Sequence, residues 1–193
     1  MKDGAGKRGR AAMAGSGSSI LVTGLPGTGK TTLIVGLARH LQTMNPVGFY
    51  TVEIREKGIR QGFELVSLDG RKGVLSHVGY PGRERVGKYG VDVKGFDAFL
   101  DTIPFMDKSY GLVIIDEIGK MECLSRKFTA LVEEVLYSGR PLVATIAQKG
   151  SGLIAGIKQR QDVVMYGLTQ GNRDMLKKVI LNLVQQNITN VPG

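Results

Sequence analysis

Residues 19–41 read SILVTGLPGTGKTTLIVGLARHL. An apolar run, a glycine-rich turn and a stretch with helical spacing follow one another in this segment. The run over 19–23 is mostly apolar and β-branched, which favours a strand buried on both faces of a sheet. A glycine-rich turn follows, and over 31–41 apolar residues recur at helical spacing. The residues of that helical face are Leu33, Ile34, Leu37 and Leu41. A strand, a glycine turn and a helix in this order predict the opening unit of an α/β fold.

The glycine turn at residues 24–31 reads GLPGTGKT, a full match to the phosphate-loop (P-loop, Walker A) pattern G-x-x-x-x-G-K-[ST]. Glycines let the backbone N–H groups point inward at phosphate oxygens, and the positive end of the next helix faces the same anions. We expect Lys30 to reach the β- and γ-phosphates and the Thr31 hydroxyl to ligate Mg²⁺. The predicted nucleotide-binding residues of this loop are Gly24, Leu25, Pro26, Gly27, Thr28, Gly29, Lys30, Thr31 and Thr32.

A second apolar run, LVII at residues 112–115, ends in two acids, Asp116 and Glu117. Downstream of a phosphate-binding loop, this pattern is typical of a Walker B strand. We therefore expect Asp116 to hold Mg²⁺ and Glu117 to orient and polarise an attacking water. Lys120 and Glu122 follow closely and should lie near the phosphates. Glu122 could be a second water-positioning acid, or these two charges could be a solvated pair on a loop.

Residues 47–78 differ from the α/β pattern around them. Two runs rich in aromatic and β-branched residues, at 48–54 and 62–68, show partial alternation and predict strands. Asp69-Gly70 is a hairpin turn signal that leads to a third run at 73–78. We therefore expect an inserted antiparallel hairpin or meander in this part of the chain.

Residues 79–94 are dense in glycine and basic, and we expect a long surface loop there that could serve as a lid. Ser125 is a plausible N-cap for a following helix, and Met175 is expected to face inward from the last one. Further helices are expected at 95–101, 125–137 and 172–187, and further strands at 112–115, 141–146 and 162–168. Strands that alternate with helices predict a three-layer α/β domain with a mostly parallel sheet. In P-loop ATPases with a catalytic glutamate after the Walker B aspartate, one more strand separates the P-loop strand from the Walker B strand. Residues 141–146 would be that strand, with Thr145 either a γ-phosphate sensor or an ordinary buried threonine.

The composition of the 193 residues narrows the class of protein. A formal net charge of +9 suits an anionic partner, yet no recognised nucleic-acid motif appears and aromatic residues are only 6%. One cysteine excludes an intramolecular disulfide, and two histidines argue against a structural metal site. No run reaches the roughly 18 apolar residues of a membrane span. We expect a cytoplasmic protein with a disordered basic Gly/Ser tail at 1–18 and a P-loop domain at 19–193; its oligomeric state is left open.

Several blocks together carry a family resemblance. They are LPGTGKTTL (25–33), GFYTVEIREKGIRQGF (48–63), RVGKYGVDVKGF (85–96), VIIDEIGKMECLS (113–125) and NRD (172–174). These blocks resemble the small P-loop nucleoside triphosphatases first described from thermophiles, a family with a human relative called the cancer-related nucleoside triphosphatase. The resemblance runs from about residue 20 to residue 183 and implies a core similar to RecA-like ATPases.

The resemblance also implies slow, Mg²⁺-dependent hydrolysis of ATP, GTP and other nucleoside triphosphates to diphosphate and phosphate. Residues 24–32 would be the phosphate loop, Asp116 and Glu117 the Walker B pair, and Lys120 and Glu122 part of the family's G-K-M-E block. Bacterial relatives often carry a histidine after the Thr-Ile of residues 145–146, whereas this chain has Ala147.

A transition-state arginine is worth orders of magnitude in phosphoryl transfer, but the sequence does not select one. The candidates are Arg55, Arg60, Arg83, Arg85, Arg140, Arg160 and Arg173. Arg173 is also a candidate for stacking on the nucleotide base.

Two other functions remain open at this stage. One is a kinase that transfers a phosphoryl group to a nucleoside, nucleotide or polynucleotide, and the other is a nucleotide-regulated RNA-binding module. The glutamate after Asp116 favours a hydrolase, because a kinase usually protects the phosphoryl group from water.

Overall fold

The computed structural model describes residues 19–189 of the chain. Its strands are β1 (Ser19–Thr23), β2 (Pro46–Glu56), β3 (Ile59–Ser67), β4 (Lys72–His77), β5 (Arg85–Val86), β6 (Tyr89–Val91), β7 (Leu112–Ile118), β8 (Leu142–Ile146) and β9 (Val163–Gly167). Its helices are α1 (Lys30–His40), η1 (Gln42–Met44), α2 (Val93–Asp101), η2 (Glu122–Leu124), α3 (Arg126–Tyr137), α4 (Leu153–Lys158) and α5 (Arg173–Thr189), η marking a short 3₁₀ turn. The tail expected at 1–18 lies outside the described residues.

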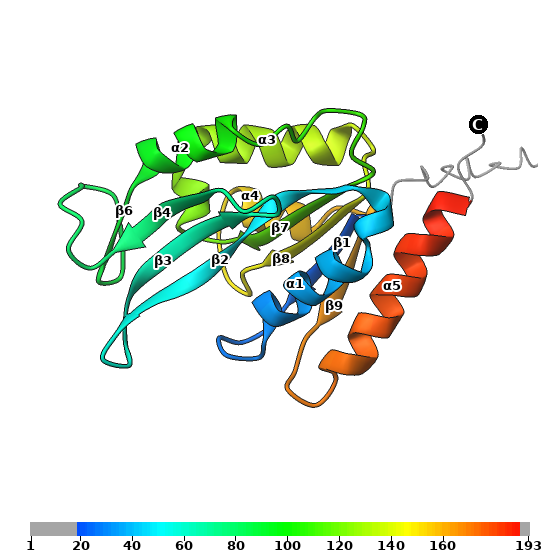
Figure 1. Ribbon diagram of the computed structural model, residues 1–193, viewed down its shortest axis with the longest axis horizontal. Helices are drawn as coiled ribbons and strands as arrows, with labels where there is room; N and C mark the ends of the chain where they lie inside the picture. The colour runs from blue at the N-terminus through cyan, green and yellow to red at the C-terminus, as the bar shows by residue number, and fades with distance from the viewer. Residues whose placement is uncertain (1–18, 190–193) are drawn as a thin grey trace, which may run out of the picture.

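Within this part of the chain the nine strands form one sheet, in the order β5-β6-β4-β3-β2-β7-β8-β1-β9 (Figure 1). The neighbours from β2 to β9 in this order pair in parallel. β8 lies between β1 and β7, as we expected for residues 141–146. Because the strands are parallel, the glycine turn after β1 and the acid pair of β7 lie toward the same edge of the sheet.

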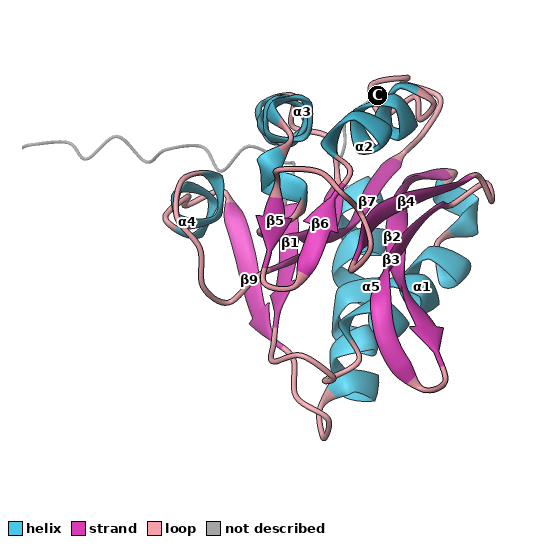
Figure 2. Cartoon of the chain, turned by 90° about the vertical axis from the view of Figure 1, so that its left-hand side faces the viewer, coloured by secondary structure: helices cyan, strands magenta, loops and turns pink. Residues whose placement is uncertain are grey.

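Helices cover both faces of the sheet (Figures 1 and 2). Along β1 the side chains alternate, so that Ile20 and Val22 pack with α1 and α5 while Leu21 joins the core beneath α2, α3 and α4. The predicted three-layer α/β fold is therefore confirmed. Among residues 19–189, no helix has the length and apolar character that a membrane crossing requires.

Phe49 anchors β2 in the core under α2 and α3. Its ring is buried and makes edge-to-face contacts with four other phenylalanines at centroid distances of 5.7–6.4 Å. Those four are Phe96, Phe99, Phe105 and Phe128. Such pairs add to the stabilisation that burial of the rings already gives, so this point of β2 is firmly held.

The predicted antiparallel strands are present, and they continue the main sheet. β2 pairs in parallel with β7 over residues 46–49 and then extends beyond it, paired with β3 from Phe49 to Glu56. β4 and β6 add further antiparallel pairs outward from β3. The β2–β3 hairpin is thus an arm that grows out of the parallel core.

Three local expectations were wrong or incomplete. The predicted loop at 79–94 contains the β5–β6 hairpin and the start of α2, which Asp92 caps by accepting a hydrogen bond from Gly95 N. Strands of two or three residues are too short to show the alternation of apolar and polar residues from which a strand is predicted. Helix α4 was not expected at all. Met175 is exposed, because α5 buries the face of Leu176, Ile180 and Val184 instead. Ser125 caps α3 as expected, accepting a hydrogen bond from Phe128 N at 2.9 Å.

Candidate active site

The glycine-rich loop at residues 24–29, which the sequence predicts to bind phosphate, joins β1 to α1. Gly29 stands directly before the helix with φ of 90°, a left-handed conformation that glycine adopts without steric strain. Thr28 Oγ1 donates to Leu25 O at 2.8 Å and closes the tip of the loop. No side chain of the described residues caps α1, and its first turn holds no acid. The N–H groups at the start of α1 are therefore available to an anion.

Lys30 links this loop to the end of β7. Its Nζ donates to Gly24 O at 3.1 Å and lies 3.4 Å from Glu117 Oε2. The lysine is only 14% exposed, so its charge is held close to the loop and to the acid pair. A phosphate oxygen that entered here would meet a cation whose position is already fixed.

Asp116 is buried at 1% exposure, and both of its carboxylate oxygens accept hydrogen bonds from hydroxyls. Thr31 Oγ1 donates to Oδ2 and Thr145 Oγ1 donates to Oδ1, each at 2.5 Å. Burial raises the pKa of Asp116, while the two hydroxyls and Lys30 oppose that rise. In this arrangement Thr145 holds the aspartate in place. Whether it also senses the γ-phosphate stays a prediction.

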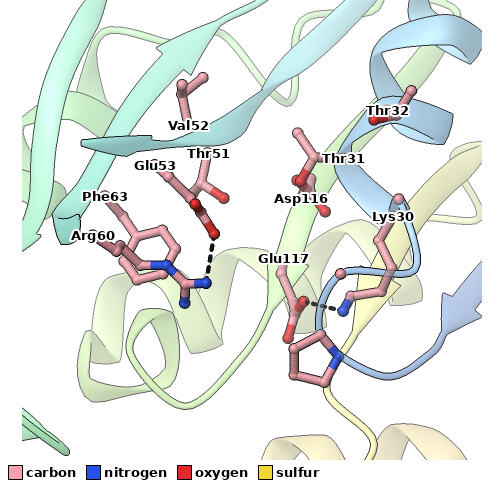
Figure 3. A pocket seen from close by; sticks show the side chains of 13 residues that line it. Lys30, Thr31, Thr32, Thr51, Val52, Glu53, Arg60, Phe63, Asp116 and Glu117 are labelled. Atoms are coloured by element: carbon pink, nitrogen blue, oxygen red, sulfur yellow. Dashed lines mark hydrogen bonds and ion pairs between the residues drawn. The ribbon is translucent and has the colours of Figure 1, made fainter. Parts of the chain in front are cut away.

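Two cavities meet at the Lys30–Glu117 pair. The first, about 460 Å³, lies between the phosphate loop and the β2–β3 hairpin (Figure 3). The second, about 320 Å³, extends toward Glu122 and the residues that follow β8. Residues that line both are Pro26, Lys30, Thr51, Phe63 and Glu117. Glu117 therefore stands at the boundary between the two spaces.

Glu117 and Glu122 flank Gly119. A Cβ atom on Gly119 would lie 2.6 Å from Glu122 Oε2 and 3.3 Å from Glu117 Oε1. Burial raises the pKa of Glu117, the neighbouring Asp116 adds to that rise, and Lys30 opposes it. Glu122 is only 6% exposed, and burial, with the charges of Glu117 and Asp116, raises its pKa to about 8. Lys120 is exposed at the rim of the second cavity.

Replacing Glu122 by glutamine is expected to change how stability depends on pH. The folded pKa of about 8 lies above the ordinary value of 4.5, so between these values the folded protein binds more protons than the unfolded chain. Wild-type stability should therefore fall as pH rises through this window, whereas Glu122→Gln cannot titrate. Urea unfolding without nucleotide should show the variant gaining on wild type by about 1–4 kcal/mol between pH 5 and pH 8.

The matched control is Glu133→Gln, on the exposed face of α3. Its free energy of unfolding should keep a constant offset from wild type at every pH. Parallel pH profiles for Glu122→Gln and wild type would contradict the assignment of a raised pKa to Glu122.

The arginines weighed from the sequence have different surroundings. Arg140 donates to the carbonyls of Asp107 and Tyr110, and Arg160 pairs with Asp162. The guanidinium of Arg173 lies beside the phosphate loop, because a Cβ on Gly29 would be 3.3 Å from Arg173 Nη1. Arg173 does not line either cavity described above, whereas Arg60 lines the first one.

Sequence reasoning did not assign the hairpin residues that complete the first cavity. They are Thr51, Val52, Glu53 and Phe63, together with Arg60, which was only one candidate among seven. Thr51 and Glu53 lie two apart on β2 and so share a face of the strand, but Val52 between them also lines the cavity, so alternation alone does not select these residues. The sequence alone did not show that this face turns toward the phosphate loop.

The fold and the site together define a P-loop protein of the α/β class. A family model described as NTPase matches residues 19–181, and the chain belongs to that family.

Its relatives span almost the same length of chain. The chain is 45% identical over 169 residues to nucleoside-triphosphatase THEP1 of Thermotoga sp. (strain RQ2), covering 87% of this chain and 96% of that protein. It is 40% identical over 184 residues to the human cancer-related nucleoside-triphosphatase, covering 87% and 97%. The crystal structure of THEP1 from Aquifex aeolicus superposes with a TM-score of 0.78 at 34% identity, covering 86% and 99%. The family resemblance expected from the sequence is confirmed.

Proposed function

We propose that this protein hydrolyses nucleoside triphosphates to the diphosphate and phosphate, with Mg²⁺ as cofactor. The observation that carries the proposal is the convergence of Lys30, Thr31, Asp116 and Glu117 on one cavity at the N-terminus of α1. The names of the relatives, which are nucleoside-triphosphatases, support the same reaction. ATP and GTP are the first substrates to test. We further propose a cytoplasmic protein, in keeping with its single cysteine.

The residues present fit a magnesium ion. Thr31 Oγ1 and Asp116 Oδ2 are hard oxygen donors 2.5 Å apart, and both residues line the first cavity. No group of three or more His, Cys, Asp or Glu side chains in residues 19–189 could cage a metal. One hydroxyl and one carboxylate that share the ion with phosphate oxygens suit Mg²⁺, which usually keeps several waters. When bound, it would neutralise charge on the β- and γ-phosphate oxygens.

The chain's own groups supply the rest of the chemistry. The loop amides and the positive end of α1 hold the triphosphate, and Lys30 offsets charge where the β–γ bond breaks. Glu117 orients a water and accepts its proton, and its raised pKa makes it a stronger base. Glu122, protonated near pH 7, helps to position the same water from the second cavity. We propose that Arg173, beside the phosphate loop, stacks on the base.

Chelation of divalent cations is expected to abolish hydrolysis. ATP with excess EDTA should release phosphate at the rate of a protein-free control, and Mg²⁺ added back should restore the rate, because Thr31 and Asp116 cannot neutralise phosphate charge themselves. The thermal midpoint of the nucleotide-free protein should not change with EDTA. An unchanged rate in EDTA would contradict the role of Thr31 and Asp116 as metal ligands.

A kinase is the second candidate, and the second cavity is the observation that favours it. Its rim carries Lys120, Gln148 and Lys149, which could hold a polar or anionic acceptor. One experiment separates the candidates: phosphate release from ATP and Mg²⁺, with and without a panel of nucleosides, nucleotides and oligonucleotides. Acceptor-dependent loss of ATP without free phosphate would overturn the hydrolase proposal. Retained nucleotide binding with negligible turnover, and RNA binding that weakens with salt, would favour the RNA-binding module.

A further inference from the structure

The β2–β3 hairpin forms the wall of the first cavity that faces the phosphate loop (Figure 3). Arg60 projects from this wall, and its guanidinium points into the space toward Glu117. Lys30 approaches the same space from the opposite side. A triphosphate held by the loop would therefore have a cation on each side of its terminal phosphate.

Two contacts hold the guanidinium of Arg60 in position. Its Nη2 lies 2.7 Å from Glu53 Oε1, and its Cζ lies 5.4 Å from the centroid of the Phe63 ring. Its Nε is covered by protein but has no hydrogen-bond partner. Among the buried side-chain nitrogens and oxygens of residues 19–189, only Thr23 Oγ1 also lacks a hydrogen-bond partner. A covered donor without an acceptor is destabilising, so the contacts within the described residues do not fully satisfy the guanidinium of Arg60.

The charges on this wall do not balance. Glu53 is the single carboxylate shared by Arg55, at 2.6 Å, and Arg60, at 2.7 Å. One carboxylate cannot fully pair with two guanidiniums, so Glu53 only partly neutralises Arg60. Arg55 is otherwise occupied, since its Nη1 donates to Gly58 O at 2.7 Å in the hairpin turn, and it does not line the cavity. Arg60 is therefore the arginine of this pair that a ligand can reach.

We propose that Arg60 is a catalytic residue that contacts the γ-phosphate oxygens as charge develops on them. The proposal rests on the proposed function, because it concerns the same hydrolysis. In that step the water oxygen bonds to the γ-phosphorus, the bond from phosphorus to the diphosphate oxygen breaks, and the water proton passes to Glu117. Arg60 forms no covalent bond; its fork of donors stabilises the transition state.

The test measures kcat for ATP and the Kd for ADP in three variants, Arg60→Ala, Arg60→Lys and Arg55→Ala. Arg60→Ala should lower kcat by about 10²-fold or more. Its Kd for ADP should stay within about twofold of wild type, because ADP lacks the γ-phosphate. Arg60→Lys keeps the charge and the stem but not the fork, so it should recover only a small part of the rate. It also serves as the test variant if Arg60→Ala does not fold.

Arg55→Ala is the matched control, since it removes the other partner of Glu53 and should keep kcat near wild type. Guanidinium chloride at a concentration that does not denature the protein should restore part of the Arg60→Ala rate. A structural role for Arg60 would not give such rescue. If the wild type hydrolyses ATP and Arg60→Ala matches Arg55→Ala, the assignment of Arg60 is wrong. If the wild type itself releases no phosphate, the proposed function fails instead.

Discussion

Replacing Glu117 by glutamine lowers kcat for ATP hydrolysis by about 10²–10⁴-fold and leaves nucleotide bound, if Glu117 is the residue that accepts the proton of water. Glutamine has nearly the same shape but cannot take a proton. The carboxylate lies 3.4 Å from Lys30 Nζ and faces both cavities, so its loss affects the chemical step most. Phosphate release and the binding of a fluorescent ATP analogue would measure the two effects separately.

Lys30→Ala is the companion variant, and for it we expect nucleotide binding to be lost together with turnover. Lys30 donates to Gly24 O and lines the first cavity, where we expect the phosphates to bind, so its removal should weaken nucleotide binding as well as turnover. Glu133→Gln, on the exposed face of α3, controls for the loss of one negative charge and should keep full activity. Hydrolysis by Glu117→Gln at the wild-type rate would remove Glu117 from the mechanism.

Gly48→Ala is expected to destabilise the fold by more than about 4 kcal/mol or to prevent folding. Gly48 lies on β2 opposite Ile114 of β7, with φ of 143°, a conformation that other residues rarely adopt. A Cβ atom there would lie 1.7 Å from the carbonyl oxygen of Ile114. That oxygen is backbone in a central strand, so it cannot move aside without breaking the β2–β7 pairing. Urea unfolding followed by circular dichroism would measure the loss.

Gly156→Ala provides the matched control for the substitution itself. Gly156 lies within α4, and a Cβ there meets nothing within 4 Å. Alanine in a helix is favoured over glycine by about 0.5–1 kcal/mol, so this variant should be slightly more stable than wild type. If Gly48→Ala unfolded at the same urea concentration as wild type, the close approach of β2 to β7 would be disproved.

The parallel half of the fold could be predicted from the sequence, because each of its elements carries a strong local signal. The apolar run at 19–23, the glycine turn and the run at 112–115 identify two strands and the loop without reference to their neighbours. The antiparallel half was predicted as an inserted hairpin or meander, without its connection to the main sheet. That β2 joins β7 and so continues the main sheet depends on tertiary pairing, which a single sequence does not record.

In the site, too, the residues that belong to local motifs could be predicted, and those placed by tertiary pairing could not. Lys30, Thr31 and Asp116 follow from motifs whose geometry is set by a loop and a strand end, and the structure brings them together. The residues of the hairpin wall belong to no motif with a known site geometry. Choosing Arg60 over Arg55 required knowing which side chain faces the cavity and which one bonds the hairpin turn, and that depends on the twist of the arm.

The β2–β3 hairpin is fixed at one end and projects from the sheet at the other. Its root is clamped, because β2 pairs with β7 over residues 46–49 and β3 pairs with β4 over residues 62–66. Farther out, β2 and β3 pair with each other, apart from Gln61 O, which accepts a hydrogen bond from Val78 N at 2.8 Å, and their register shifts between Ile54 and Arg55. An irregularity of this kind increases local twist and is the natural point for a bend.

A displacement of the hairpin turn near Lys57 and Gly58 would therefore bend the outer part of β2 and β3 and leave residues 46–49 and 62–66 in place. Arg60 lies in the free part, opposite Arg55, whereas Lys30 and Asp116 belong to the clamped framework. A bend at the register shift would change the distance between Arg60 and the loop that carries Lys30. Asp116 lies on β7, outside the arm, and would keep its place in that movement.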